Sequence, residues 1–256
     1  MAWNNMPARW YEAYDRGRPG YPPEAVRLAG LPSSASVLDL GAGTGKLTRL
    51  LVSTFARVIA VEPDDEMLRL LRAGCPEAEV LTGSAELIPL PDRSVDAVFA
   101  AQSFHWFANE RALGELARVL TPGGTLVLLW NLPAGPTEPP IGDVQRLLEP
   151  HWPEGWDFPL DLGLSTSGQG TGDWRDALTH SPFEQLQEAR VANPQVVEPE
   201  ELVAFFASMG WIANLDDEMR VPLLDQVRQS LTAAEYRVPW QTHVCWTRLA
   251  DGPERA

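Results

Sequence analysis

The sequence predicts an α/β fold built on a doubly wound, seven-stranded and mostly parallel sheet with helices on both faces. Short apolar runs of strand length alternate with segments of helical periodicity over residues 32–131. Turns rich in glycine and proline, such as residues 121–124, separate these segments. The first apolar run, residues 37–40, leads directly into a glycine-rich turn and a helix start, which is typical of a buried parallel strand.

The order of the elements follows from periodicity, capping residues and turn signals. Asp64 and Asp65 are expected to stabilise the start of a helix after the second strand, and Asn109 to cap the helix after the fourth strand. The expected strands cover residues 37–40, 57–62, 79–81, 95–101, 125–130, 183–196 and 242–249. The expected helices include a short one from Glu24 and others over residues 46–53, 110–120, 143–148, 199–209 and 216–231.

Changes in composition divide the chain into four segments. Residues 1–31 are expected to form an N-terminal cap, because the stretch around Arg18 is too polar and too rich in proline for a core. Residues 32–131 form the expected α/β core. Residues 132–182 are rich in proline, glycine and tryptophan and are expected to be an insertion that recognises the substrate. Residues 183–256 supply the remaining strands with inserted helices.

Composition narrows the functional class. The net charge of −15 over 256 residues disfavours unguided binding to nucleic-acid phosphates. The sequence has neither an apolar run of about 20 residues nor the pattern of a signal peptide, so we expect a soluble, cytoplasmic protein without membrane contacts. Cys75 and Cys245 lie far apart, and the four histidines show no metal-ligand spacing, so we expect neither a disulfide nor a metal.

The turn after the first strand suits a ligand with a cationic end. Glycine at 41, 43 and 45 permits positive φ and close approach of a ligand to the backbone. A mononucleotide P-loop does not fit, because the turn is one residue too short and Leu47 stands where a magnesium-binding hydroxyl belongs. A dinucleotide is disfavoured, because the third glycine comes one residue early and Asp39 would repel a pyrophosphate. The same carboxylate would attract an ammonium group.

Two strings resemble those of a known family. LDLGAGTG at residues 38–45, with Glu62 at the end of the next strand, resembles the glycine-rich motif of class I S-adenosylmethionine-dependent methyltransferases. AAQSFHWF at residues 100–107 resembles the segment after the fourth strand in the methyltransferase type 11 group, especially its trans-aconitate methyltransferase-like branch. The resemblance implies a Rossmann-like fold, S-adenosylmethionine as cofactor and a last strand inserted antiparallel at the sheet edge.

The expected cofactor contacts combine geometry with this resemblance. Glu62 lies about 20 residues past the glycine turn, where a carboxylate can accept hydrogen bonds from both ribose hydroxyls. The resemblance implies that Arg18 approaches the methionine carboxylate and Met67 the adenine. Many family members carry aspartate where Ser84 stands, so the backbone around Ala85 is the expected contact for the adenine amino group. The expected cofactor-binding residues are Arg18, Asp39, Gly41, Ala42, Gly43, Gly45, Glu62, Pro63, Met67, Ser84, Ala85, Glu86 and Gln102.

A histidine near the expected methyl position has two interpretations. His105 follows a central strand and could deprotonate a substrate hydroxyl or carboxylic acid, because an imidazole titrates near neutral pH. Alternatively, His105 and Trp106 pack the start of the next helix and hydrogen-bond the backbone. Aromatic faces suit a cationic sulfonium. The expected acceptor pocket comprises Tyr11, Tyr14, Tyr21, His105, Trp106 and Trp130.

These features predict a methyltransferase that acts on a small molecule, with a carboxylate or hydroxyl oxygen as the acceptor and in-line transfer of the methyl group. A ring carbon methyltransferase of the same superfamily is a second hypothesis. A non-catalytic regulator that binds S-adenosylmethionine is a third. A nicotinamide-dependent oxidoreductase is disfavoured by Asp39 and by the early third glycine.

Overall fold

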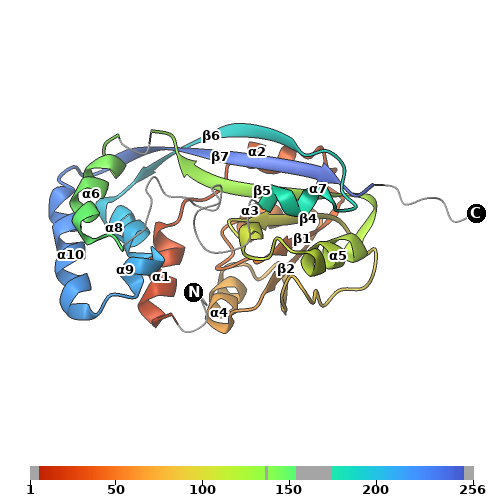
Figure 1. Ribbon diagram of the computed structural model, residues 1–256, viewed down its shortest axis with the longest axis horizontal. Helices are drawn as coiled ribbons and strands as arrows, with labels where there is room; N and C mark the ends of the chain where they lie inside the picture. The colour runs from red at the N-terminus through yellow and green to blue at the C-terminus, as the bar shows by residue number, and fades with distance from the viewer. Residues whose placement is uncertain (1–5, 136–137, 154–173, 251–256) are drawn as a thin grey trace, which may run out of the picture. The chain divides into compact units, whose positions relative to one another are not determined.

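The computed structural model describes residues 6–135, 138–153 and 174–250 (Figure 1). The chain contains two compact units. The core unit comprises the described parts of residues 21–131, 162–191 and 242–256. The helical unit comprises those of residues 1–20, 132–161 and 192–241. The segments expected as a cap and as an insertion therefore contribute to one and the same unit.

Seven strands form one mixed sheet in the order β3-β2-β1-β4-β5-β7-β6, which confirms the predicted fold class (Figure 1). The strands are β1 (Ser36–Leu40), β2 (Arg57–Glu62), β3 (Glu79–Thr82), β4 (Val95–Ala101), β5 (Leu120–Pro133), β6 (Gln187–Val197) and β7 (Tyr236–Arg248). Strands β1 to β5 run parallel to one another. Asp39 pairs in register with Ala60 on β2 and with Phe99 on β4, so it lies on a strand in the middle of the sheet.

Strand β7 runs antiparallel to β5. The Leu249 N–H donates to the Gly124 carbonyl (2.8 Å) near the start of β5, whereas the Ala134 N–H donates to the Pro239 carbonyl (2.7 Å) just past its end. The antiparallel direction of the last strand was therefore predicted correctly. Its position was not, because β7 lies between β5 and β6 and leaves β6 at the edge.

Helices cover both faces of the sheet in the core unit. Alternate residues of β1 point to opposite faces, so Val37 and Leu38 are both fully buried but belong to different apolar clusters. Helices α2 and α3 pack on the Val37 face, and α5 and α7 pack on the Leu38 face. The helices of this unit are α2 (Pro23–Arg27), α3 (Thr48–Val52), α4 (Asp65–Gly74), η1 (Phe104–Trp106), α5 (Glu110–Val119) and α7 (Trp174–Thr179).

The helical unit is organised around the contact of α1 with α8. Gly17, at the end of α1, lies so close to α8 that a Cβ atom there would be 2.1 Å from the Phe205 nitrogen. The Trp10 indole N–H donates to the Ser208 carbonyl at 2.9 Å, which fixes the two helices side by side. The helices of this unit are α1 (Ala8–Gly17), α6 (Ile141–Leu148), η2 (Glu149–His151), α8 (Pro199–Ala207), α9 (Gly210–Ala213) and α10 (Asp217–Ser230).

Several boundaries differ from the sequence-based expectation. Helix α3 begins at Thr48 instead of residue 46, because Gly45 is still in the left-handed conformation. Strand β5 begins at Leu120 and includes the expected turn at residues 121–124, which forms a register shift against β4. The β7 strand begins six residues before the expected Thr242. Helices α1 and α7 were not predicted.

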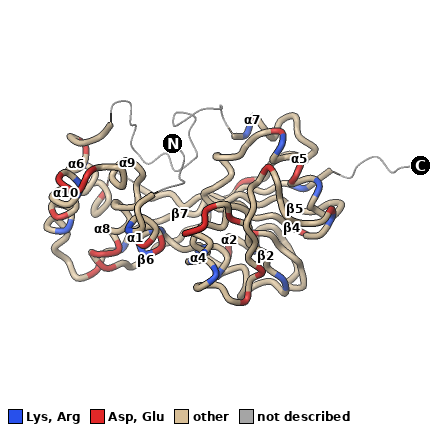
Figure 2. Tube along the Cα trace, turned by 90° about the horizontal axis from the view of Figure 1, so that it is seen from below, with Lys and Arg blue, Asp and Glu red and all other residues tan. Residues whose placement is uncertain are grey.

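Acidic positions outnumber basic ones, 35 to 20, and both kinds occur along the surface helices (Figure 2). In helix α4, for example, the acidic residues Asp65 and Glu66 lie in the first turn and the basic residue Arg72 lies in the last turn. This arrangement complements the helix dipole. Among the described residues, none of the helices has the length and apolar character required to span a bilayer.

Candidate functional site

The glycine-rich turn at the end of β1 requires all three of its glycines. Gly41, Gly43 and Gly45 have φ values of 68°, 59° and 88°, which disfavour other residues. A Cβ atom on Gly41 would lie 2.8 Å from the Ser103 Cβ, and one on Gly45 would lie 2.7 Å from the Leu71 Cδ1. The turn is therefore constrained both by its backbone conformation and by the side chains packed against it.

Backbone amides tie this turn to the end of β2. The N–H groups of Gly41 and Ala42 both donate to the Val61 carbonyl, at 2.9 and 3.1 Å. The Gly43 N–H donates to Glu62 Oε2 at 2.9 Å. Hydrogen bonds thus hold the turn and the carboxylate at the end of the next strand together.

Asp39 carries a buried carboxylate oxygen that has no partner among the described residues. Its side chain is 1% exposed, and its Oδ2 accepts a 2.6 Å hydrogen bond from Thr48 Oγ1. Its Oδ1 is buried and has no hydrogen-bond donor within the described parts of the chain. Burial raises the pKa of Asp39 to about 7, and the negative charge of Glu62 adds to the effect. An orphaned buried acceptor is costly, so this oxygen fits a ligand that supplies a cationic donor.

Glu62 is oriented by two backbone amides. Besides Gly43, the Asp64 N–H donates to its carboxylate, to Oε1 at 3.0 Å. Burial raises the pKa of Glu62, and these two hydrogen bonds partly offset that effect. Because a carboxylate oxygen has more than one acceptor site, each still has capacity for a hydroxyl donor. Asp64 itself caps α4 by accepting from the Glu66 and Met67 amides, which confirms its predicted role.

The segments expected around adenine lie next to the turn and after β3. Met67 is buried, and its Sδ would lie 3.5 Å from a Cβ on Gly43, so it packs against the glycine turn. Pro63 is exposed. Ser84 begins a tight turn in which the Leu87 N–H donates to its carbonyl at 3.2 Å. Glu86 accepts a hydrogen bond from Asn109 Nδ2 at 3.1 Å, so its carboxylate already has a partner on the protein.

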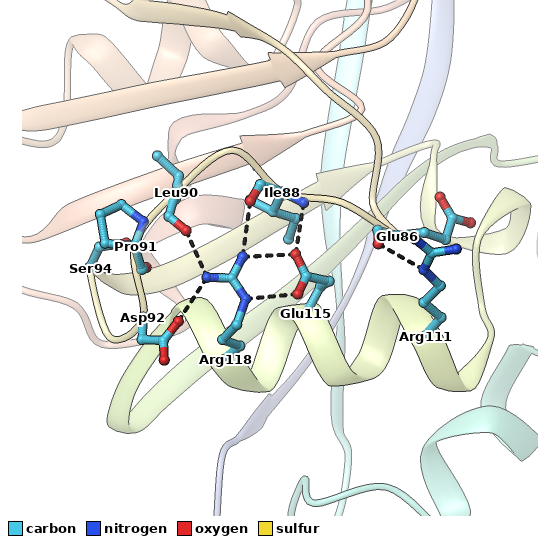
Figure 3. A network of polar contacts seen from close by, with 9 residues as sticks. All are labelled: Glu86, Ile88, Leu90, Pro91, Asp92, Ser94, Arg111, Glu115 and Arg118. Atoms are coloured by element: carbon cyan, nitrogen blue, oxygen red, sulfur yellow. Dashed lines mark hydrogen bonds and ion pairs between the residues drawn. The ribbon is translucent and has the colours of Figure 1, made fainter.

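Helix α5 holds the segment that follows this turn (Figure 3). Arg118 donates to the carbonyls of Ile88 (2.9 Å) and Leu90 (2.7 Å) and pairs with Glu115 and Asp92. Glu115 in turn accepts from the Ile88 N–H at 2.8 Å, and the Arg118 guanidinium lowers the pKa of Glu115. We use the name α5 clamp for the Glu115 and Arg118 side chains of α5 together with residues 86–92, which they hold. It fixes the loop that carries Ser84 and Ala85.

The carboxyl end of β4 holds a strained residue. Gln102 has φ of 55°, and its amide and side chain donate to the carbonyls of Leu129 (2.8 Å) and Asn131 (3.1 Å). Positive φ in a non-glycine residue is costly and often marks a functional position. The next residue, Ser103, donates to the Leu40 carbonyl at 2.9 Å and so joins β4 to the glycine turn.

His105 has an aromatic partner that the sequence did not indicate. The Trp130 indole Nε1–H donates to His105 Nδ1 over 3.4 Å. Trp130 is 0% exposed and stacks on Trp174 with ring centroids 4.7 Å apart. Trp130 therefore contacts His105 from a buried position, and its place in the acceptor pocket stays a prediction. The Trp106 ring lies 4.6 Å from the His105 ring, and Trp106 is 48% exposed.

The remaining expected residues are distributed over both units. Tyr21 packs in the core unit against the apolar cluster of α2 and α3. Tyr11 and Tyr14 lie on α1 in the helical unit, each with its ring 5.1 Å from Trp10. Arg18, in the same unit, donates to the hydroxyl (2.9 Å) and the carbonyl (3.3 Å) of Ser208. The contribution of these helical-unit residues to a cofactor site stays a prediction.

Two residues of the site were missed from sequence. Thr48 supplies the hydrogen bond to Asp39, and Ser103 supplies the link between β4 and β1. A small hydroxyl residue is too common to be singled out by type. Only their positions could have pointed to these two residues. Thr48 is the first residue of the helix after the turn, and Ser103 follows the strained end of a central strand.

Comparison with known proteins identifies relatives of this chain. The family model described as a methyltransferase domain matches residues 38–128. An uncharacterised methyltransferase of Mycobacterium tuberculosis is 42% identical over 221 residues, which is 86% of this chain and 82% of that protein. A malonyl-[acyl-carrier protein] O-methyltransferase of Methylococcus capsulatus is 44% identical over 109 residues, covering 39% of this chain and 40% of that protein. The solved structure of a candidate type II methyltransferase from Anaeromyxobacter dehalogenans superposes with a TM-score of 0.62 at 21% identity, over 92% and 99% of the two chains.

Proposed function

The chain belongs to the class I S-adenosylmethionine-dependent methyltransferases, and on that premise we propose that it methylates a small molecule at a carboxylate or hydroxyl oxygen. The observation that carries the proposal is the buried, unpartnered Oδ1 of Asp39 beside a turn of three positive-φ glycines. An anionic acceptor atom in this position complements a ligand with an ammonium group and no phosphate. The early third glycine and Asp39 together disfavour a dinucleotide.

The residues of the core unit fit the parts of S-adenosylmethionine one by one. Asp39 Oδ1 would accept from the α-ammonium group, and Glu62 from the ribose hydroxyls. The glycine turn lets the backbone approach the ligand, and Met67 offers an apolar surface for adenine. By family resemblance, Arg18 of the helical unit would bind the methionine carboxylate.

The chain's own task in catalysis is positioning. When bound, the cofactor supplies an electrophilic methyl group on a sulfonium. The protein has to hold the acceptor oxygen about 3 Å from that methyl carbon, in line with the bond that breaks, and to exclude water. Aromatic side chains near a sulfonium are favourable, and the exposed Trp106 is the core-unit candidate for this role.

The contact between Trp130 and His105 favours a carboxylate over a hydroxyl acceptor. Since an indole can only donate, His105 Nδ1 accepts, and the proton of the neutral imidazole is on Nε2. In this tautomer Nε2 carries a hydrogen and would orient a carboxylate oxygen as a donor, whereas deprotonation of a hydroxyl needs an acceptor there. A carboxylate is already ionised at neutral pH and needs no base. The O-methyltransferase relative from Methylococcus capsulatus is consistent with an oxygen acceptor.

Calorimetry followed by mass spectrometry tests this function. We expect the purified protein to bind S-adenosylmethionine and S-adenosylhomocysteine. Incubation with pooled small carboxylic acids and phenols should then add one methyl group to a carboxylic acid, and mild base should remove it again as expected for an ester. Binding without any product would support the regulator. A base-stable product would refute the carboxylate acceptor, and fragmentation would then distinguish an ether formed on a hydroxyl oxygen from the product of a carbon methyltransferase. No cofactor binding at all would refute the site.

A further inference from the structure

Three side chains of the kinds that bind metal ions meet on the β6 and β7 strands of the core unit. Glu188 lies on β6, and His243 and Cys245 lie on β7. One ligand atom from each residue lies within 4.8 Å of the others. His243 Nε2 is 3.1 Å from Glu188 Oε2 and 3.5 Å from Cys245 Sγ. We call these residues the Glu–His–Cys cluster.

The strand geometry explains why these residues meet. Side chains two residues apart on a strand share a face, so His243 and Cys245 lie together while Val244 between them packs in the cluster on the other face. Glu188 reaches the same face from the neighbouring strand. The expectation that the protein has no metal site was based on the spacing of histidines in the sequence. A mixed set of ligands from two strands leaves no such spacing.

The distances in the cluster suit a tetrahedral ion. Zinc binds a thiolate sulfur at about 2.3 Å and an imidazole nitrogen at about 2.0 Å, which places the two atoms about 3.5 Å apart at a tetrahedral angle. The observed separation of Cys245 Sγ from His243 Nε2 is 3.5 Å. Rotation of the Glu188 side chain, which is 43% exposed, can bring its carboxylate into the third position.

The burial and charge of the cluster point to the same kind of ion. Cys245 and His243 are buried and Glu188 is not, so the cluster opens to solvent on the Glu188 side and leaves a fourth position for water. Sulfur, nitrogen and oxygen donors together suit zinc rather than magnesium or calcium. The thiolate is the form of cysteine that binds a metal ion, so ion binding has to displace the Cys245 thiol proton.

The arginine side chains near the cluster are compatible with a bound cation. Arg175 on α7 pairs with Glu188 through Oε1 at 3.3 Å, which is the oxygen that His243 does not contact. Arg175 and Arg190 both disfavour positive charge at His243. A thiolate and a carboxylate offset the two charges of the ion, so the loaded cluster is close to neutral.

We propose that Glu188, His243 and Cys245 bind one zinc-type divalent cation per chain, with water as the fourth ligand. The ion cross-links β6 to β7. Its ligands are not among the residues assigned to methyl transfer, and the His243 ring lies 6.5 Å from the ring of Trp130. One thiol proton leaves for each ion bound.

Cobalt(II) is the probe for this site. The full chain, reduced and freed of metals with a chelator, is titrated with Co²⁺ and followed by absorption. We expect the visible bands of a tetrahedral cobalt ion and a near-ultraviolet thiolate-to-cobalt band, both saturating at one ion per chain and both lost on addition of Zn²⁺. Calorimetry with Zn²⁺ in two buffers of different ionisation enthalpy should report the release of about one proton.

The two cysteines of the chain provide a matched pair of variants. Cys245→Ser should abolish the thiolate-to-cobalt band. Cys75→Ser, which alters a buried thiol of the same unit near the Gly45 carbonyl, should retain it. His243→Gln should weaken Zn²⁺ binding by at least about tenfold, and circular dichroism establishes that each variant is folded. The proposal is refuted if the wild type lacks the band, if Cys245→Ser retains it, or if folded His243→Gln binds Zn²⁺ as the wild type does.

Discussion

At the residue scale, Asp39 is the clearest case of a side chain held ready for a ligand. Its buried Oδ1 has no partner within the described chain, and its raised pKa reports the cost of ionising it without one. We expect Asp39→Asn to weaken S-adenosylhomocysteine binding by about 1–3 kcal/mol, because an amide cannot offer a full charge to the ligand's ammonium group. Calorimetry measures this loss. Asp65→Asn, an exposed position in the first turn of α4, is the control that should leave affinity unchanged.

Variants of His105 can distinguish its two possible roles, hydrogen-bond donor to the acceptor and general base. If its Nε2 donates to a carboxylate acceptor, His105→Gln keeps a donor and should retain more activity than His105→Ala. We expect His105→Ala to lower kcat/KM by about 100-fold and His105→Gln to lower it clearly less. Equal losses in both variants would instead indicate a general base. Steady-state kinetics with the identified acceptor makes the comparison, and cofactor affinity should stay at the wild-type value in both.

At the element scale, the α5 clamp is expected to contribute both stability and cofactor affinity. Arg118→Met removes the donors to the Ile88 and Leu90 carbonyls, and we expect a loss of about 1–3 kcal/mol in the free energy of unfolding. Urea denaturation measures the stability, and hydrogen exchange should increase selectively in residues 86–92. Arg69→Met removes only an exposed ion pair with Glu66 and should change stability by less than about 1 kcal/mol. A loss of similar size in both variants would contradict the clamp.

Two helical glycines should respond to alanine in opposite directions. A Cβ on Gly17 would lie 2.1 Å from the α8 backbone, which no rotamer change can relieve, so Gly17→Ala should destabilise the chain by about 1–3 kcal/mol or more. Gly114, inside α5, has no positive φ, and apart from its chain neighbours and the α5 backbone no described atom lies within 4 Å of the position that a Cβ there would take. Gly114→Ala should therefore stabilise by about 0.5–1 kcal/mol. Urea denaturation measures both variants, and a Gly17→Ala variant as stable as the wild type would contradict the packing described for α1 and α8.

At the scale of the whole molecule, local patterns predicted more than long-range contacts. The sequence predicted β4 with its observed bounds, the caps at Asp64 and Asn109 and the glycine turn, because each depends on residues a few positions apart. It did not predict the partner of His105, because Trp130 lies 25 residues later on another strand. The Glu–His–Cys cluster was missed for the same reason, since Glu188 and His243 are 55 residues apart.

The helices that were missed depend on tertiary packing. The α1 helix has no side-chain cap and begins after Pro7, so local signals for a helix start are weak. What holds it is the burial of Trp10 and its hydrogen bond to Ser208, which is 198 residues away. Tertiary contacts of this kind override local preference.

The coupling of Asp39 to its ligand should be visible in the stability of the whole chain. Its pKa is raised from 3.8 to about 7 in the free folded protein, so the folded state binds more protons than the unfolded state between those values. The contribution of Asp39 to the free energy of unfolding therefore falls as pH rises from about 4 to about 7. The ligand's ammonium group binds the ionised carboxylate, so affinity should rise over the upper part of the same window.

Stabilisation by S-adenosylhomocysteine should consequently be larger at pH 8 than at pH 6. A ligand at 100 times its Kd stabilises by about 2.7 kcal/mol, and a tenfold weaker affinity at the same concentration removes about half of that. Thermal denaturation with and without ligand at the two pH values measures the difference. Glu62 also has a raised pKa and titrates beside Asp39, so the comparison needs Asp39→Asn, in which only the Glu62 part of the pH dependence should remain. An equal shift at both pH values in the wild type would show that Asp39 does not meet the ligand as an ionised group.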